Sequence, residues 1–522
     1  MQFTSMTFLA FAAVLIALYY VVPKKIQWVV LLVASYIFYI SAGVEYLFFI
    51  LFTTISTYLA ARVIDSRVAK QKAYLKEHKA DLSRDEKKEY KAKVKKKNQV
   101  ILVIYLILNF GVLAVCKGLL IAPFNEMAQG TPLGFLSLGL PLGISFYMFQ
   151  SVGYVVDIHR GAVEAEKNFF KTALFVSFFP QLVQGPISKF SQLAPQLFGE
   201  HKFNGKKLSY GLQRILWGFF KKLVIADRLA AAVGALKAPE YEGMGFILLA
   251  TFYAIQLYGD FTGGIDVAIG LGECFGIEMT ENFLRPFFSK NIAEYWRRWH
   301  ISLGEWMKDY IFYPLSVCQP MRKLSKATHK KWGNFGKRVP VYIASVITWF
   351  VTGIWHGFTP NFIVWGMLNC FFIVLSEELV PLYEKFHNRF GLKEKKLYGV
   401  FEMLRMFTLM NLIRISDLFP DVGVYFGRLA SLVTNPNISV LWNGSLMSLG
   451  LTALDYAIVG VGIVIMLTVS IIGEKKGSVR DVLAEKNAFL RCSIIFILFL
   501  CVLLAGSYGI GYNASNFIYN QF

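Results

Sequence analysis

Charge is scarce in this sequence, and the short motifs that mark soluble enzymes are absent from it. Only 17% of its 522 residues are charged and 55% are hydrophobic, with a mean hydropathy of +0.48. A soluble globular domain carries about 25% charged residues, so this composition excludes that class. The sequence contains no nucleophile-elbow, zinc-protease, Walker or dinucleotide-binding motif. Its six cysteines show no paired spacing and no carboxylate–histidine cluster has ligand spacing, so we expect neither a disulfide framework nor a metal site.

Acidic residues are also in short supply, because 54 lysines and arginines face 34 aspartates and glutamates. In a soluble protein this excess would suggest nucleic acid, but here the basic residues lie in short segments between apolar runs. The largest of these segments, residues 62–98, is dense in lysine and nearly free of large apolar residues. Basic loops of membrane proteins stay in the cytoplasm. We therefore expect residues 62–98 to be a charged cytoplasmic loop whose residues form a solvated charged helix, and we expect no binding to nucleic acid.

Apolar runs recur along the whole chain and predict membrane-spanning helices. A span needs about 20 apolar residues, and several of the runs are shorter or are broken by glycine and proline. The pattern therefore predicts an all-α polytopic membrane protein with roughly ten to twelve transmembrane helices, plus re-entrant and interfacial amphipathic helices. No fixed-period repeat and no inverted halves are evident, so we interpret residues 1–522 as one integral-membrane domain in contact with lipids.

The basic segments also predict the orientation of the chain. Counting spans back from residues 62–98 places the N-terminus outside, and counting forward places the C-terminus outside. The first apolar run, 8–22, ends in Val-Pro-Lys-Lys without a small-residue cleavage site. We therefore expect a retained first helix rather than a signal peptide.

The segment 295–315, YWRRWHISLGEWMKDYIFYPL, divides into two faces when it is read as a helix at 100° per residue. Arg297 and Arg298 fall on the polar face, whereas Trp299 falls on the aromatic face. A helix rich in tryptophan and tyrosine with such a polar face suits the headgroup level of a membrane. His300 lies with the aromatic residues, where a histidine is either a satisfied core residue or a functional group.

A second histidine, His356, ends the apolar run 341–357. Helical spacing places it on the same face as Trp349 and Gly353. Imidazole is the side chain best matched to general-base chemistry near neutral pH, so His300 and His356 are the candidate catalytic residues. Such a base could take a proton from an attacking hydroxyl while an acyl group is transferred from a thioester.

Two further polar side chains lie inside apolar runs, where they are costly and mark candidate functional sites. Gln181 belongs to FPQLVQGPI (179–187), a run too broken for a plain span that is better interpreted as a re-entrant element lining a cavity. Asp260 lies in the glycine-rich run 256–276, where close helix packing with a carboxylate bonded to its neighbours is the alternative interpretation. We expect both to contact substrate.

Four segments carry a family resemblance. They are FFPQLVQGPI (178–187), YGDFTGGIDVAIGLGECFGI (258–277), ENFLRPFFSKNIAEYWRRWHISLGEWMKDYIFYPL (281–315) and TGIWHGFTPNFIVWGM (352–367). Together they resemble the membrane-bound O-acyltransferase (MBOAT) superfamily and, within it, the alginate-type branch of bacterial polysaccharide O-acetyltransferases. The resemblance covers most of the chain. It departs from the branch within FTGGIDVAIG (261–270) and at 365–369, where Trp-Gly-Met-Leu-Asn excludes the third histidine that many relatives carry.

The resemblance implies a helical ring with a central funnel in a bacterial plasma membrane, and it gives both histidines a role. His356 matches the superfamily histidine and would be the main general base. His300 would lie towards the cytoplasmic mouth and would orient or polarise the thioester. Arg297 and Arg298 would hold the donor's phosphates or extend to lipid headgroups, and Trp299 and Trp355 would contact substrate.

The reaction implied by the resemblance is O-acetylation of an exported polysaccharide. Acetyl-CoA would be the cytoplasmic donor, no cofactor would stay bound, and an extracytoplasmic hydrolase-like acetyltransferase would complete the transfer. The final residues 517–522, FIYNQF, resemble the C-terminal motif of surface-acylation systems, in which a tyrosine carries the acyl group. Tyr519 is therefore a candidate acyl relay, and an aromatic anchor at the membrane interface is the alternative.

Two other functions stay open. The teichoic acid D-alanylation branch of the same superfamily takes its acyl group from a carrier protein, although its members tend to be shorter after the Trp-His-Gly motif. A transporter of lipid-linked sugars is the third possibility, and the absence of inverted repeats argues against it.

Overall fold

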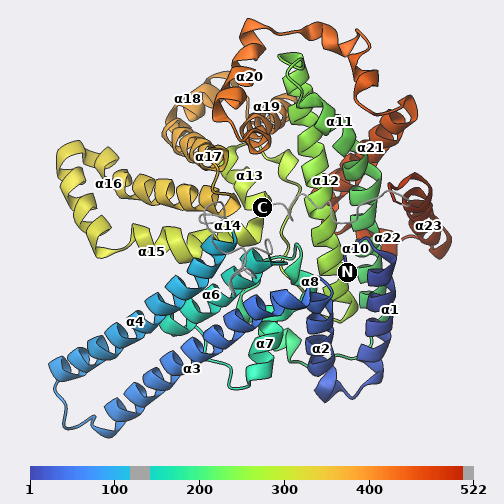
Figure 1. Ribbon diagram of the computed structural model, residues 1–522. Coiled ribbons are helices and arrows are strands. Elements are labelled where there is room, and N and C mark those ends of the chain that lie inside the picture. Colours follow the sequence, from blue (N-terminus) through green and yellow to red (C-terminus); the bar gives the residue numbers. More distant parts are fainter. Residues whose placement is uncertain (118–140, 509–522) are drawn as a thin grey trace, which may run out of the picture. The chain divides into compact units, whose positions relative to one another are not determined.

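The computed structural model describes residues 1–117 and 141–508 (Figure 1). Within these residues the structure is helical and contains no strand, and the one β-type pairing is an isolated antiparallel bridge between Phe283 and Trp299. The predicted all-α class is confirmed. The chain divides into two compact units, of which the first is Met1–Gly211 with Leu271–Thr280 and the second is Leu212–Gly270 with Glu281–Phe522.

The first unit is built on helices that begin at the N-terminus. Its helices are α1 (Met6–Val21), α2 (Gln27–Ile40), α3 (Leu47–Glu77), α4 (Arg84–Cys116), α6 (Ile144–Arg160), α7 (Phe169–Ser177), α8 (Phe179–Leu182) and α9 (Phe190–Leu197), and α10 (Gly205–Phe219) begins in it. The predicted re-entrant run 179–187 is the single turn α8 followed by non-helical chain. All of its residues are buried. The amide of Phe179 donates a hydrogen bond to Ser35 Oγ on α2 at 3.1 Å, which fixes where this turn begins.

The charged segment 62–98 is helical over most of its length and continues two apolar helices. Helices α3 and α4 lie side by side as an antiparallel pair, and residues 78–83 connect them (Figure 1). A capping box starts α4, because the Ser83 side chain accepts from the Glu86 amide and the Glu86 carboxylate accepts from the Ser83 amide. The lysines are therefore helical, and they extend both helices beyond their apolar parts.

The second unit contains the longest described helix, α16, and the segments around both candidate histidines. After the π-helical segment η4 (Phe220–Ala226), its main helices are α11 (Asp227–Leu236), α12 (Met244–Cys274), α13 (Ile292–Arg298), α14 (Ile301–Met307), α15 (Tyr313–Ser316), α16 (Gln319–His356), α17 (Pro360–Glu378), α18 (Val380–Phe390), α19 (Lys396–Arg414), α20 (Val422–Thr434), α21 (Ala453–Lys476), α22 (Val479–Ala484) and α23 (Ala488–Ala505). A further π-helical segment, η6 (Lys308–Phe312), joins α14 to α15, and the short 3₁₀ segment η7 (Ile415–Leu418) follows α19.

Glycines let two pairs of segments in this unit approach closely. A Cβ on Gly263 of α12 would lie 2.9 Å from the carbonyl oxygen of Gly218 on α10. A Cβ on Gly353 of α16 would lie 2.6 Å from the carbonyl oxygen of Phe362 on α17. Both distances are shorter than carbon–oxygen contact allows, so only glycine permits these backbones to pack together.

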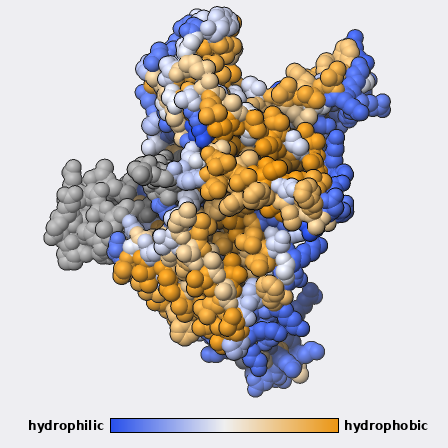
Figure 2. All heavy atoms as spheres, turned by 90° about the vertical axis from the view of Figure 1, so that its right-hand side faces the viewer, coloured by the Kyte–Doolittle hydropathy of each residue, from blue (hydrophilic) through white to orange (hydrophobic). Residues whose placement is uncertain are grey.

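Seven described helices are long and apolar enough to cross a membrane. They are the helices within Val44–Glu77, Arg84–Cys116, Met244–Cys274, Gln319–His356, Pro360–Glu378, Ala453–Lys476 and Ala488–Ala505. Two shorter apolar helices, Met6–Val21 and Val422–Thr434, accompany them. None of the residues of α23 is buried, and hydrophobic residues make up much of the face shown in Figure 2. A multi-pass membrane protein explains such a surface, since lipid covers it; the number of ten to twelve spans stays a prediction.

The prediction of one amphipathic helix over 295–315 is wrong. The chain there forms α13, α14, η6 and α15 in succession, and the first break comes at Trp299 and His300. His300 has a φ of 47°, in the left-handed region that helices exclude. The physical reason is the pairing of this segment with residues 282–284, which takes the backbone hydrogen bonds that a continuous helix would need.

Candidate active site

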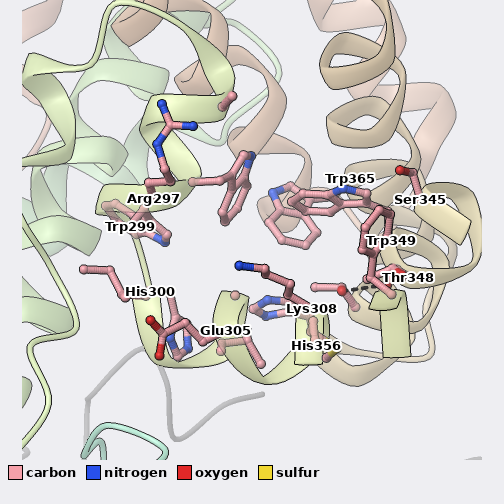
Figure 3. Close-up of a pocket in the computed structure, with 18 of the residues that line it drawn as sticks. Arg297, Trp299, His300, Glu305, Lys308, Ser345, Thr348, Trp349, His356 and Trp365 are labelled. Atoms are coloured by element: carbon pink, nitrogen blue, oxygen red, sulfur yellow. Dashed lines mark hydrogen bonds between the residues drawn. The ribbon is translucent and has the colours of Figure 1, made fainter. Parts of the chain in front are cut away.

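A cavity of about 390 Å³ lies inside the second unit, and both candidate histidines line it (Figure 3). Residues of α13, α14, η6 and α16 form most of its wall, and α12, α17, α19 and η7 complete it. A volume of this order lies in the range of small-molecule binding sites. The structure therefore brings the two candidate histidines, which belong to distant segments, to one cavity, although His300 does not lie on a regular helix.

Backbone pairing holds His300 in its unusual conformation. The amide of Leu284 donates to the carbonyl oxygen of Arg298 at 2.9 Å, and the amide of Ile301 donates to the carbonyl oxygen of Asn282 at 3.0 Å. These two bonds flank the bridge between Phe283 and Trp299. A non-glycine residue in the left-handed region is strained, and such strain persists only where the surroundings impose it.

The side chain of Asn282 fixes the orientation of the His300 ring. Asn282 Oδ1 accepts hydrogen bonds from the amide of Ser302 at 3.0 Å and from Ser302 Oγ at 2.9 Å. His300 Nδ1 lies 3.3 Å from the same oxygen. Because a carbonyl oxygen only accepts, the hydrogen bond requires a proton on Nδ1, which leaves the acceptor lone pair on Nε2.

The environment of His300 favours the neutral imidazole. Its side chain is buried, and the ring of Phe261 packs against it with a centroid distance of 5.0 Å. Burial lowers the pKa of His300 to about 3, and the positive charge of Arg414 acts in the same direction. His300 is therefore a neutral hydrogen-bonding group at physiological pH.

His356 is the last residue of α16 and stands among aromatic rings. The ring of Trp365 on α17 lies 4.7 Å from it, Trp355 lies 4.8 Å away, and Phe362 stacks on it at 6.4 Å. The close glycine contact between α16 and α17 brings these residues together. His356 is half-buried, so its ring is held by packing and still reaches the cavity.

Three tryptophans form an apolar wall of the same cavity. Trp296 lies 4.8 Å from Trp349 and 5.8 Å from Trp365, and the last two lie 6.0 Å apart. Figure 3 shows Trp349 and Trp365 on the side of the cavity formed by α16 and α17. Such a wall offers apolar, water-poor surface to a bound molecule.

The remaining predicted residues fall into two groups. Arg297 and Trp299 line the cavity with the histidines, and Trp355 packs between the rings of His356 and His300 without lining it. Arg298 instead pairs with the carboxylates of Glu294 at 2.8 Å and Glu474 at 2.9 Å.

Two predicted residues lie away from the cavity, and a third is not described. Asp260 is buried in an ion pair with Lys222. Gln181 belongs to the first unit, where its Nε2 donates to Ser188 Oγ at 3.0 Å. Tyr519 falls outside the described residues. Within the described ranges, no group of three or more histidine, cysteine or acidic side chains is arranged to hold a metal ion.

Inspection of the sequence missed four charged residues of the cavity wall as candidates. Glu305 and Lys308 belong to α14 and η6 and are exposed, whereas Arg414 is buried at the end of α19 and Asp417 follows it on η7. The signal that could have found Arg414 is its position inside the apolar run 398–416, where an arginine marks a functional site by default.

Inspection of the sequence also missed two buried lysines that neutralise the carboxylates of α12. Lys221 on η4 pairs with Asp266 at 2.5 Å, and Asp266 also accepts from Arg214 at 2.9 Å. Lys222 pairs with Asp260 and, at 2.7 Å, with Asp227. These contacts agree with the interpretation of Asp260 as a carboxylate bonded to its neighbours in close helix packing.

Similarity to known proteins places the fold and the cavity in context. The sequence profile of the family "MBOAT, membrane-bound O-acyltransferase family" matches residues 159–416, which include His300, His356 and Arg414. The chain belongs to this family. It is 32% identical over 379 residues to the probable alginate O-acetylase AlgI of Pseudomonas syringae pv. tomato, a match that covers 72% of this chain and 66% of the relative. The matched part thus spans about two thirds of that protein's length.

Two further relatives of the family show its range. The probable alginate O-acetylase AlgI of Azotobacter vinelandii is 32% identical over 382 residues, covering 73% of this chain and 69% of the relative. The peptidoglycan O-acetyltransferase of Helicobacter pylori is 32% identical over 280 residues, covering 48% of this chain and 50% of the relative. The resemblance predicted from the four sequence segments is confirmed.

Proposed function

We propose that this chain is a bacterial membrane O-acetyltransferase that moves acetyl groups from a cytoplasmic thioester, acetyl-CoA, towards an exported polysaccharide. The observation that carries the proposal is the single cavity that His300 and His356 share with a wall of tryptophans. Relatives named as alginate and peptidoglycan O-acetyltransferases support the acceptor class, since both act on polysaccharides.

His356 is the general base of the proposed reaction. It takes the proton from an acceptor hydroxyl as that hydroxyl attacks the acetyl carbon, and it returns the proton to the departing thiolate. His300, with its proton on Nδ1, offers the Nε2 lone pair and so orients the donor by accepting from an N–H group, such as an amide of a pantetheine arm. Arg297, exposed at the cavity, attracts the donor's phosphates.

The test is transfer of radiolabelled acetyl groups by purified protein in liposomes, with acetyl-CoA supplied on the side of the basic segment 62–98. Label is followed on the protein itself and, with the extracytoplasmic acetyltransferase present, on an acceptor polysaccharide. Wild type should become labelled, and His356→Ala should lose at least about 10³-fold of that rate. His387→Ala is the matched control, because His387 on α18 contacts Tyr398 and Glu402 and does not line the cavity. Transfer by His356→Ala at the wild-type rate would overturn the assignment.

The donor and its side of the membrane are tested in the same assay. Acetyl-CoA supplied only on the opposite face should give no label, as the orientation with both termini outside requires. An acyl-carrier thioester is the competing donor. Labelling from that thioester and not from acetyl-CoA would replace the donor while leaving the role of His356 in place.

The C-terminal tyrosine completes the proposal. Tyr519 accepts the acetyl group from the cavity and passes it to an extracytoplasmic hydrolase-like acetyltransferase, which acetylates the polysaccharide. Tyr519→Phe removes the hydroxyl that would carry the group and keeps the aromatic ring. It should abolish transfer to the acceptor, and normal transfer by this variant would leave Tyr519 as an anchor only.

A further inference from the structure

Arg414 brings a buried positive charge to the cavity that holds the two histidines. It is the last residue of α19, its side chain is 5% exposed, and it lines the cavity. Its Nη2 donates to the hydroxyl of Tyr295 at 2.8 Å, and its guanidinium lies 3.8 Å from the centre of the Trp299 ring. A guanidinium has five N–H donors, so one described hydrogen bond leaves donor capacity on the cavity side.

The surroundings of Arg414 are unusual for a buried cation. It forms no ion pair with any residue in the described ranges, whereas Arg214 pairs with two carboxylates. Asp417, three residues later, lines the same cavity, and its Oδ1 is buried without a hydrogen-bond partner among the described residues. Burial raises the pKa of Asp417 to about 7, and Arg414 opposes that shift. Asn361 fixes the turn between them by donating to the carbonyl oxygens of Ser416 and Asp417 at 3.2 Å.

Acyl transfer needs such a charge, and the two histidines do not supply it. When a hydroxyl adds to a thioester carbonyl, negative charge develops on the carbonyl oxygen and must be stabilised. His356 is occupied with the proton of the hydroxyl. His300, with its proton on Nδ1 directed at Asn282, presents an acceptor and cannot donate to an oxyanion from Nε2.

The other two cations of the cavity wall are less suited to this task. Arg297 and Lys308 are both exposed, so water weakens their interaction with a charge in the cavity. Arg414 is shielded from water, and packing against Trp299 together with the bond to Tyr295 fixes its position before substrate arrives. A fixed charge in a water-poor site is the arrangement that stabilises a transition state best.

We propose that Arg414 stabilises the oxyanion of the tetrahedral intermediate, an inference that rests on the proposed acetyltransferase function. The oxygen of the acceptor hydroxyl forms a bond to the acetyl carbon, and His356 takes its proton. The π electrons of the carbonyl move to its oxygen, which Arg414 faces. When the carbonyl re-forms, the carbon–sulfur bond breaks, and the leaving thiolate receives the proton from His356.

The experiment compares Arg414→Gln and Arg414→Lys with wild type in the liposome transfer assay. Arg414→Gln should lower kcat by about 10²–10³-fold with a KM for acetyl-CoA within about threefold of wild type. Arg414→Lys keeps a charge with a different reach and should lose about tenfold. Arg405→Gln is the matched control on the same helix, because Arg405 is exposed and its one hydrogen bond among the described residues goes to the carbonyl oxygen of Lys290.

Chemical rescue separates a direct role from a structural one. Added guanidinium ion should restore part of the kcat of Arg414→Ala without shifting its melting temperature. If Arg414→Gln does not fold, Arg414→Lys and the rescue decide the matter. An unchanged kcat in the folded variants, or a loss confined to KM, would overturn the oxyanion role, whereas an active His356→Ala would overturn the proposed function itself.

Discussion

Lys222 and Arg414 are both buried cations of the second unit, but the structure neutralises them in different ways. Lys222 contacts the carboxylates of Asp260 and Asp227. Arg414 contacts a phenol and an indole ring and faces a cavity. A buried charge with ionic partners inside the protein is explained by folding alone, whereas one that faces a cavity without them implies a ligand. The comparison thus distinguishes a buried cation that stabilises the fold from a buried cation that belongs to a binding site.

The largest effect on stability should come from Lys222→Met, which removes the buried cation that Asp260 and Asp227 share. We expect a loss of about 3–5 kcal/mol in the free energy of unfolding, the range for breaking a buried ion pair. Denaturation in detergent, followed by tryptophan fluorescence, measures it. Lys222→Met combined with Asp260→Leu should recover part of the loss. If Lys222→Met alone is as stable as wild type, Lys222 does not stabilise the fold and the contrast with Arg414 fails.

Asn282→Leu should come next, because it removes the acceptor shared by His300 Nδ1, the Ser302 amide and Ser302 Oγ. Leaving these buried donors unsatisfied costs about 2–3 kcal/mol. Acetyl transfer should fall with it, since the ring of His300 loses its fixed orientation. Ser188→Ala, which removes one buried hydrogen bond in the first unit, is a control that should leave kcat unchanged.

Arg414→Gln should reduce stability far less than Lys222→Met does. It removes one hydrogen bond and one contact between a cation and a ring, worth about 1 kcal/mol each, and it also removes a buried charge that disfavours folding. We expect a net change of at most about 2 kcal/mol alongside the large loss of kcat. A loss as great as that of Lys222→Met would place Arg414 with the scaffold.

The lowered pKa of His300 makes stability depend on pH. Its folded pKa is about 3 and its ordinary value is 6.5, so between these values the unfolded chain binds a proton that the folded chain does not. Stability from this group is therefore complete above pH 6.5 and falls as the pH is lowered, by about 1 kcal/mol between pH 6.5 and 5.5. His300→Gln should flatten that part of the profile, and an identical profile in the variant would show that His300 is protonated when folded.

The smallest effect should come from Arg298, whose ion pairs with Glu294 and Glu474 are only partly buried. Arg298→Gln should cost less than about 1 kcal/mol, and added salt should reduce that difference, as for surface ion pairs. Its KM for acetyl-CoA should match wild type, because Arg298 does not line the cavity. A raised KM would restore Arg298 to the binding site.

The amino-acid sequence predicted the helical membrane class and both histidines because these depend on apolar runs and on short segments. It did not predict the break at His300, because that break depends on Asn282 and Phe283, which belong to a different segment of the chain. The pairs Lys221–Asp266 and Lys222–Asp260 join residues 45 and 38 positions apart, and no periodicity within one helix specifies such pairs. Arg414 appeared only as the end of an apolar run, since its neighbours in the cavity come from distant residues.

The two lysines of η4 also fix the rotation and the axial position of α12. Adjacent residues of a helix point in different directions around its axis, and residues six apart on an α-helix, such as Asp260 and Asp266, diverge by about 120°. Two neighbouring lysines can therefore satisfy both carboxylates in one rotational setting only. A slip of α12 by one residue would separate both ion pairs at once. Leu257 of the same helix lines the cavity, so these ion pairs also hold one wall of the cavity in place.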